Sequence, residues 1–156
     1  MIPRQKEAAE IIRIGLVGGF RTVADAIRWA DDVVAADSDP DPAIIEVALA
    51  GELSSAEVVS RLSVVAGTAD ATTVWRAVFA DILRTVDADH SRGEAIAHWL
   101  YSSTRNRELP EETFGSEPLF LEDYFAGARE GWGGTYDEAF RELRAYLARE
   151  ASRPEA

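Results

Sequence analysis

Two histidines and the carboxylates near them are the side chains best suited to chemistry in this sequence. His90, Glu94 and His98 follow one another at four-residue intervals, which would align three possible metal ligands along one helix. A capping box formed by Ser91 and Glu94 would instead start that helix after His90, and the three side chains would then not share a continuous face. A structural site also needs a fourth ligand, and the sequence contains no Cys. We therefore predict that the protein binds no metal ion.

Other catalytic arrangements are equally incomplete. Asp87 and Asp89 could orient His90 as a general base, but no nucleophile is evident nearby. The remaining carboxylates could supply an acid–base pair or bind Mg²⁺, yet no spacing defines such a pair. The Gly-Trp-Gly-Gly run at 131–134 lacks the Lys and the preceding strand of a phosphate-binding loop, and is typical of a turn between helices. We expect no catalytic residue, no cofactor and no enzymatic activity.

Acidic side chains are the strongest functional signal. The formal net charge is -12, and two acidic stretches contain no Lys or Arg. The first acidic cluster consists of Asp31, Asp32, Asp37, Asp39 and Asp41, and the second of Glu108, Glu111, Glu112, Glu117, Glu122 and Asp123. Such acidity argues against nucleic acids and anionic membrane surfaces as partners, because their phosphates require Lys and Arg. It fits a basic protein partner, with solubility as the alternative explanation.

The position of the first acidic cluster favours a role in binding. Asp31 and Asp32 lie near the C-terminus of an expected helix, where the helix dipole disfavours negative charge. Stability therefore does not obviously explain them. The functional interpretation is an electrostatic docking face, and the alternative is a solvated helix end.

Two aromatic residues occur in segments expected to be irregular. Trp132 lies in the Gly-rich turn, and Phe114 lies in the long acidic loop. Each is either packed over the core or exposed as an anchor for a partner. We expect both to be packed against the core.

Start and stop signals for helices recur along the whole chain, and no convincing strand pattern is present. Helices are expected over about 4–17, 23–36, 42–50, 55–66, 71–87, 92–104, 117–129 and 136–151. The expected caps are Thr22, Asp41 with Pro42, and Asp70, and the expected capping boxes are Ser54/Glu57, Ser91/Glu94 and Thr135/Glu138. The broad apolar stripe within 71–87 predicts the central core helix, and residues 105–118 are expected to be the longest loop.

These elements predict an all-α fold: a single-domain antiparallel helical bundle, or an irregular α-array, of seven or eight helices over residues 1–156. The tail at 152–156 is expected to fray. No apolar run approaches the ~18 residues that a membrane span needs, and the N-terminus has no apolar signal segment. With no Cys as well, these features indicate a soluble cytoplasmic protein.

One part of the sequence resembles a known family. Residues 27–32 (Ile-Arg-Trp-Ala-Asp-Asp), 39–49 (Asp-Pro-Asp-Pro-Ala-Ile-Ile-Glu-Val-Ala-Leu) and 53–59 (Leu-Ser-Ser-Ala-Glu-Val-Val) resemble small helical bacterial immunity proteins of toxin–immunity systems. The resemblance covers about residues 10–66 and rests on the order and composition of the helices. It implies a small, non-enzymatic cytoplasmic protein that neutralises a cognate toxin by binding it.

On this interpretation the acids would cover basic residues that the toxin uses to bind an anionic substrate. We assign partner binding to the whole first acidic cluster, to Glu108, Glu111 and Glu112, and to Trp132. Two alternatives stay open. One is a regulatory or scaffold helical protein with another partner, and the other is a hydrolase that uses carboxylates or a metal.

Overall fold

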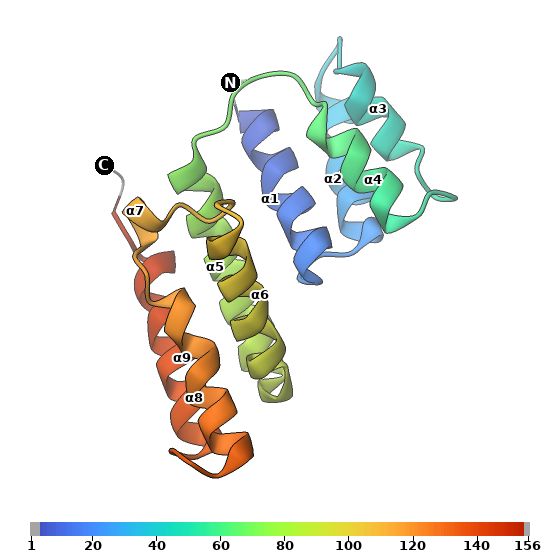
Figure 1. The fold of residues 1–156 in the computed structure, drawn as a ribbon. Helices are drawn as coiled ribbons and strands as arrows, with labels where there is room; N and C mark the ends of the chain where they lie inside the picture. The colour runs from blue at the N-terminus through green and yellow to red at the C-terminus, as the bar shows by residue number, and fades with distance from the viewer. Residues whose placement is uncertain (1–3, 155–156) are drawn as a thin grey trace. The chain divides into compact units, whose positions relative to one another are not determined.

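The computed structural model describes residues 4–154, and these residues form α-helices and one 3₁₀ turn with no strand. The helices are α1 (Arg4–Gly18), α2 (Val23–Ala36), α3 (Pro42–Ala48), α4 (Ser55–Ser63), α5 (Ala71–Ala88), α6 (Gly93–Arg105), α7 (Glu111–Phe114), α8 (Pro118–Glu130) and α9 (Tyr136–Ala151), with the 3₁₀ turn η1 (His90–Arg92) before α6 (Figure 1). The predicted all-α class is confirmed. Within residues 4–154, the single-turn helix α7 is the α-helix that the sequence does not predict.

The chain packs as two compact units, Met1–Val74 and Trp75–Ala156. The boundary falls inside the continuous helix α5, where the sequence has neither a Gly- or Pro-rich linker nor a change in composition. Acidic side chains outnumber basic ones in both units. Each unit has its own buried apolar side chains, and each is described separately below.

The first unit consists of α1 to α4 around one small core. Its helices begin where the sequence predicts, because the capping groups lie next to the backbone amides that they satisfy. Thr22 and Asp25 form a reciprocal capping box, as do Ser54 and Glu57. The core contains small and β-branched side chains, among them Ala9, Ile12, Ala26, Ala30, Ile44, Val47, Val58 and Leu62. The Ala positions on α1 and α2 permit close approach of neighbouring helices.

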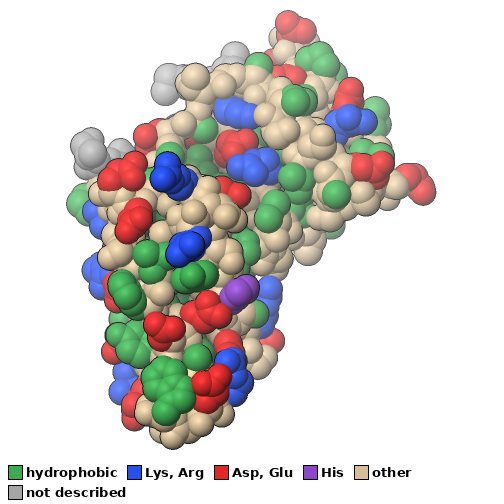
Figure 2. Space-filling model, viewed as in Figure 1, with side chains coloured by type: hydrophobic (Ala, Val, Ile, Leu, Met, Phe, Trp, Pro, Cys, Tyr) green, Lys and Arg blue, Asp and Glu red, His purple; other side chains and the backbone are tan. Residues whose placement is uncertain are grey.

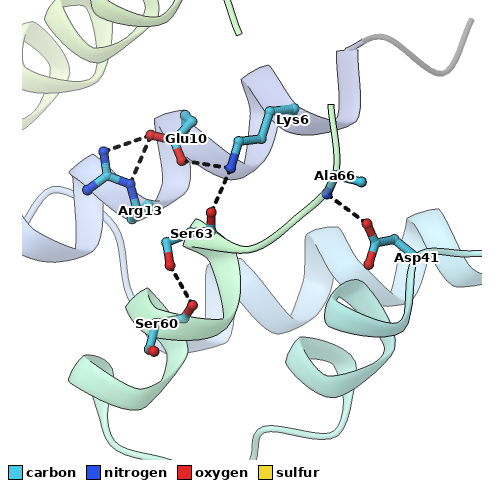
Figure 3. Close-up of polar contacts among 7 residues, drawn as sticks. All are labelled: Lys6, Glu10, Arg13, Asp41, Ser60, Ser63 and Ala66. Atoms are coloured by element: carbon cyan, nitrogen blue, oxygen red, sulfur yellow. Dashed lines mark hydrogen bonds and ion pairs between the residues drawn. The ribbon is translucent and has the colours of Figure 1, made fainter. Parts of the chain in front are cut away.

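Polar contacts connect the C-terminal end of α4 and the segment after it to α1 and to the start of α3 (Figure 3). The ammonium of Lys6 on α1 donates to the carbonyl oxygen of Ser63 at the end of α4 (2.9 Å) and pairs with Glu10 (3.3 Å). Asp41 caps α3 by accepting from the amide of Ala43 (2.8 Å). Its second oxygen accepts from the amide of Ala66 (2.8 Å), 25 residues further along the chain. Asp41 therefore serves both a helix start and a tertiary contact.

The second unit is built around the part of α5 that follows Val74. Val78, Phe79, Ile82 and Val86 are buried along the predicted stripe. The Phe79 ring meets the edges of two aromatic rings, with centroids 5.2 Å from Phe114 on α7 and 5.5 Å from Tyr146 on α9. The prediction that 71–87 is a central core helix is confirmed. In this unit α6 packs against α8 and α9, and α8 packs against α9 (Figure 1).

Two predicted capping boxes need correction. Ser91 does not cap a helix: Asp89 caps η1 by accepting from the Ser91 amide (3.1 Å) and hydroxyl (2.6 Å), and α6 begins only at Gly93. The carboxylate two residues upstream is the stronger acceptor, so it captures the Ser91 groups. The Thr135 side chain accepts from the Glu138 amide (3.2 Å), without the returning half of a capping box.

The chain end is partly fastened. Within the tail expected to fray, the guanidinium of Arg153 donates to the buried Glu150 carboxylate (2.6 Å) and lies over the Phe114 ring. Residues 155–156 lie outside the described residues. Among the residues that are described, no helix is both long enough and apolar enough to cross a membrane.

Candidate functional site

The side chains with metal-binding or catalytic potential are engaged in structural contacts. Glu94 pairs with Arg129, and the His98 ring nitrogen Nδ1 lies 2.9 Å from Glu122. The His90 ring stacks on Phe140 with a centroid distance of 4.3 Å. Between residues 4 and 154, no three His, Asp or Glu side chains are grouped closely enough to hold a metal ion.

The two aspartates near His90 are held in their charged forms. The hydrogen bonds from the Arg144 guanidinium (2.8 and 2.9 Å) keep the pKa of Asp87 below its ordinary value. The Ser91 hydroxyl and amide lower the pKa of Asp89 in the same way. Asp87 is therefore engaged by Arg144 and Asp89 by Ser91, and neither carboxylate is hydrogen-bonded to the His90 ring as the orienting partner of a general base would be.

The first acidic cluster divides into two groups. Asp31, Asp32 and Asp39 are exposed, and their side chains form no hydrogen bond or ion pair with any described residue. Asp37 is half-buried and accepts from the Asp39 amide (3.0 Å) and the Gln5 side chain (3.4 Å). Asp41 holds two backbone amides. Only the three exposed aspartates are therefore available to a partner without breaking an internal contact.

The second acidic cluster has no Lys or Arg within its stretch of sequence, but basic side chains from elsewhere in the chain lie next to it in the structure. Glu117 pairs with Arg149, and Glu122 with His98. Glu111 and Glu112 line a small pocket together with Arg107. Glu108 is exposed, and its carbonyl oxygen accepts from the indole of the buried Trp75 (3.0 Å). The bases missing from this stretch of sequence are supplied by other helices and by the preceding turn.

Phe114 and Trp132 behave oppositely. Phe114 is buried at 1% exposure, and its carbonyl oxygen accepts from the Tyr146 hydroxyl (3.2 Å), so the expected packing is confirmed. Trp132 is 64% exposed, and the expectation that it packs against the core is wrong. The reason lies in the turn. The carbonyl oxygen of Gly127 accepts from the amides of Gly131, Trp132 and Gly133 (2.9, 3.1 and 3.2 Å), which reverses the chain before the indole can reach the interior.

The exposed indole nevertheless has a defined position. Its N–H donates to the Glu130 carboxylate (2.8 Å). Its six-membered ring lies against Gly127, where a Cβ atom would be 3.2 Å from the ring and 2.8 Å from the Gly133 carbonyl oxygen. Gly131, with φ of 79°, provides the left-handed end of α8. Trp132 is thus held on the surface by the turn.

Next to this indole lies an open cavity of about 500 Å³, which we call the Trp132 pocket. It is lined by Asp123, Tyr124, Trp132, Gly133, Gly134, Thr135, Glu138, Ala139, Arg141 and Glu142. Figure 2 shows large hydrophobic side chains directly beside acidic ones at the end of the molecule where α8 and α9 join. The side chains of Asp123, Glu138 and Glu142 form no hydrogen bond or ion pair with other described residues. The pocket therefore combines aromatic surface with uncommitted negative charge.

Most of the Trp132 pocket is not recognised from the sequence. Tyr124 and Phe120 are apolar residues of α8 that are 47% and 55% exposed, whereas Leu121 and Phe125 on the same helix are buried. The signal that could have separated them is their spacing: Phe120 and Tyr124 form one four-residue row, and Leu121 and Phe125 form the next. Of the assigned binding residues, only Trp132 lines this pocket.

Comparison with protein-family models, curated proteins and solved structures finds no significant match to this chain.

Proposed function

We propose that this chain is a non-enzymatic binding protein for a basic protein, acting as an immunity protein that neutralises a cognate bacterial toxin. The observation that carries the proposal is the set of exposed carboxylates on Asp31, Asp32 and Asp39, none of which has a partner among the described residues. These side chains contribute no internal contact to folding. Their charge is available to a second molecule.

The local electrostatics support a role outside folding. Asp31 and Asp32 lie in the last two turns of α2, and the last turn of that helix carries no basic side chain. A stabilising arrangement at a helix C-terminus would place cations there. Two consecutive acids followed by Asp37 and Asp39 instead concentrate negative potential at this end of the helix. Such a surface speeds the approach of a basic protein and repels acidic ones.

The choice of a toxin as the partner depends on the resemblance to immunity proteins. The similar region, residues 10–66, falls within the unit Met1–Val74 and contains the first acidic cluster. A toxin that acts on an anionic substrate needs basic residues at its active surface. Covering those residues with carboxylates would block the substrate without any chemistry by this chain.

The test compares two variants with the same change in charge. The first replaces Asp31, Asp32 and Asp39 with Asn, and the second replaces Glu108, Glu111 and Glu112 with Gln. Neither set contains a carboxylate that holds an internal contact, so both variants should fold. The partner is captured from an extract of the native cells, identified and purified. Association and dissociation rates are then measured over a salt series.

We expect the Asp variant to associate about tenfold more slowly at low salt and to lose most of its salt dependence, because steering by complementary charge supplies about 10–1,000-fold in rate. The Glu variant should change less, because Glu108, Glu111 and Glu112 lie outside the region that resembles immunity proteins. The Asp variant should also protect less well against the activity of the captured toxin. Unchanged rates in the Asp variant, or a captured partner without a basic surface, would refute the proposal.

A further inference from the structure

The Trp132 pocket has the composition of a site for a basic side chain. Trp and Tyr rings attract cations over their faces, and Trp does so most strongly. Trp132 and Tyr124 line the cavity with such rings, and α9 contributes Glu138 and Glu142 to the same lining. Asp123 adds a third carboxylate from α8. The volume, about 500 Å³, lies within the range of ligand pockets, which is about 300–1,000 Å³.

The aromatic wall is already ordered before any ligand binds. The turn at 131–134 is closed by three amide donors on one carbonyl oxygen, and the indole N–H is bonded to Glu130. Gly127 leaves room for the ring edge to rest against the helix. Binding therefore need not order this side chain, a cost that exposed aromatic side chains ordinarily incur.

We propose that the Trp132 pocket binds an arginine side chain presented by a basic segment of the partner protein. The inference rests on the proposed function for the class of partner, and it adds a contact site within the unit Trp75–Ala156. Arginine fits better than lysine, because its planar guanidinium stacks on aromatic faces. Two of its N–H groups can also donate to the two oxygens of one carboxylate. Arg141 also lines the pocket, and its charge opposes an incoming guanidinium.

This arrangement predicts effects of opposite sign from neighbouring residues. Removing the Trp132 ring should weaken binding of an arginine peptide by about tenfold, whereas Phe at this position should restore part of the loss. Replacing Glu138 and Glu142 with Gln should weaken binding by about threefold at low salt, and Arg141→Gln should strengthen it by about threefold. All four side chains belong to exposed residues, so these changes leave the core intact.

The experiment uses the full chain and a fluorescein-labelled Gly-Arg-Gly-Arg-Gly peptide, with Lys and Glu peptides of the same length for comparison. Fluorescence anisotropy gives the Kd, and circular dichroism verifies that each variant is folded. The matched control is the double variant Glu7→Gln, Glu52→Gln, which changes the net charge as much as Glu138→Gln, Glu142→Gln but lies in the other unit and outside the proposed docking face. We expect binding in the order Arg, Lys, Glu, with the control equal to the natural sequence.

Two results would overturn the inference. One is a failure of the variants to discriminate: equal binding by the natural sequence and Trp132→Ala would show that the ring does not contribute, and equal losses in the two double variants would show that binding reflects overall charge. The other is a dimer in sedimentation analysis that Trp132→Ala converts to a monomer, because a second copy of the chain would then occupy the pocket. The peptide experiment tests the Trp132 pocket independently of the proposed docking face. Peptide binding in the pocket with no effect of Asp31 and Asp32 on the partner would refute the docking face alone.

Discussion

Gly127→Ala tests whether the turn at 131–134 is held as the structure shows. In an ordinary exposed helix this change should stabilise the protein by about 1 kcal/mol, because Ala is the better helix former. At Gly127, however, the new Cβ would lie 2.8 Å from the Gly133 carbonyl oxygen and 3.2 Å from the Trp132 ring. The Gly133 oxygen belongs to the backbone and cannot swing away as the end of a flexible side chain can. The whole turn at 131–134 would therefore have to shift.

The size of the effect follows from opposing contributions. Forced overpacking costs about 1–3 kcal/mol, and moving the turn weakens the three hydrogen bonds to the Gly127 carbonyl, each contributing about 1 kcal/mol. After subtraction of the gain in helix propensity, we expect a net loss of about 1–2 kcal/mol in the free energy of unfolding. The assay is denaturant unfolding monitored by circular dichroism.

The matched control is Gly133→Ala, in the same turn, where a Cβ would meet no atom within 4 Å. It should leave the free energy of unfolding within about 0.5 kcal/mol of the natural value, as surface substitutions ordinarily do. Gly127→Ala should also weaken arginine-peptide binding, because it displaces the Trp132 ring. If Gly127→Ala is as stable as Gly133→Ala, or more stable than the natural sequence, the close packing of the turn on α8 is refuted.

Two further predictions concern stability. Phe79→Ala removes a fully buried ring packed against two other rings, and should cost about 3–5 kcal/mol in denaturant unfolding, whereas Phe120→Ala, at an exposed position, should cost less than about 1 kcal/mol; similar losses would contradict the assignment of the core. The backbone hydrogen bond from Thr22 lowers the pKa of Asp25 below its ordinary value of 3.8. A carboxyl whose pKa is depressed by folding stabilises the protein above its unfolded value and loses that contribution as the pH falls through its folded value. The stability difference between the natural sequence and Asp25→Ala should therefore be present at pH 6 and shrink below about pH 4. A pH-independent loss in Asp25→Ala would contradict the role of the charged capping box.

Much of the fold could be predicted from the sequence because helix starts depend on near neighbours. Thr22 and Asp25, like Ser54 and Glu57, satisfy amides only three residues away, so their contacts follow from the local order of residues. The buried stripe of α5 is predictable for the same reason, since residues three and four apart share one face of a helix. The sequence also establishes the excess of acids, which no folding can change.

The candidate site depended on contacts that the local sequence does not contain. Asp41 belongs to an acidic run in the sequence, but folding brings the Ala66 amide to its second oxygen. Glu117 lies in a stretch without bases, yet α9 brings Arg149 to it. Trp132 has a large apolar side chain of the kind that is usually buried. The three hydrogen bonds to the Gly127 carbonyl oxygen nevertheless keep it on the surface.

The division between sequence and tertiary structure has one physical reason. A helix and its caps form from groups within four residues of one another, and their order in the chain decides which of them meet. Which side chains meet across helices is decided only when all the apolar faces of a unit are buried together. The sequence by itself therefore determined an all-α, acidic protein and the approximate positions of α1 to α6, α8 and α9. Only the tertiary structure decided which carboxylates remain unpaired and that the Trp132 ring lies beside a pocket of acids.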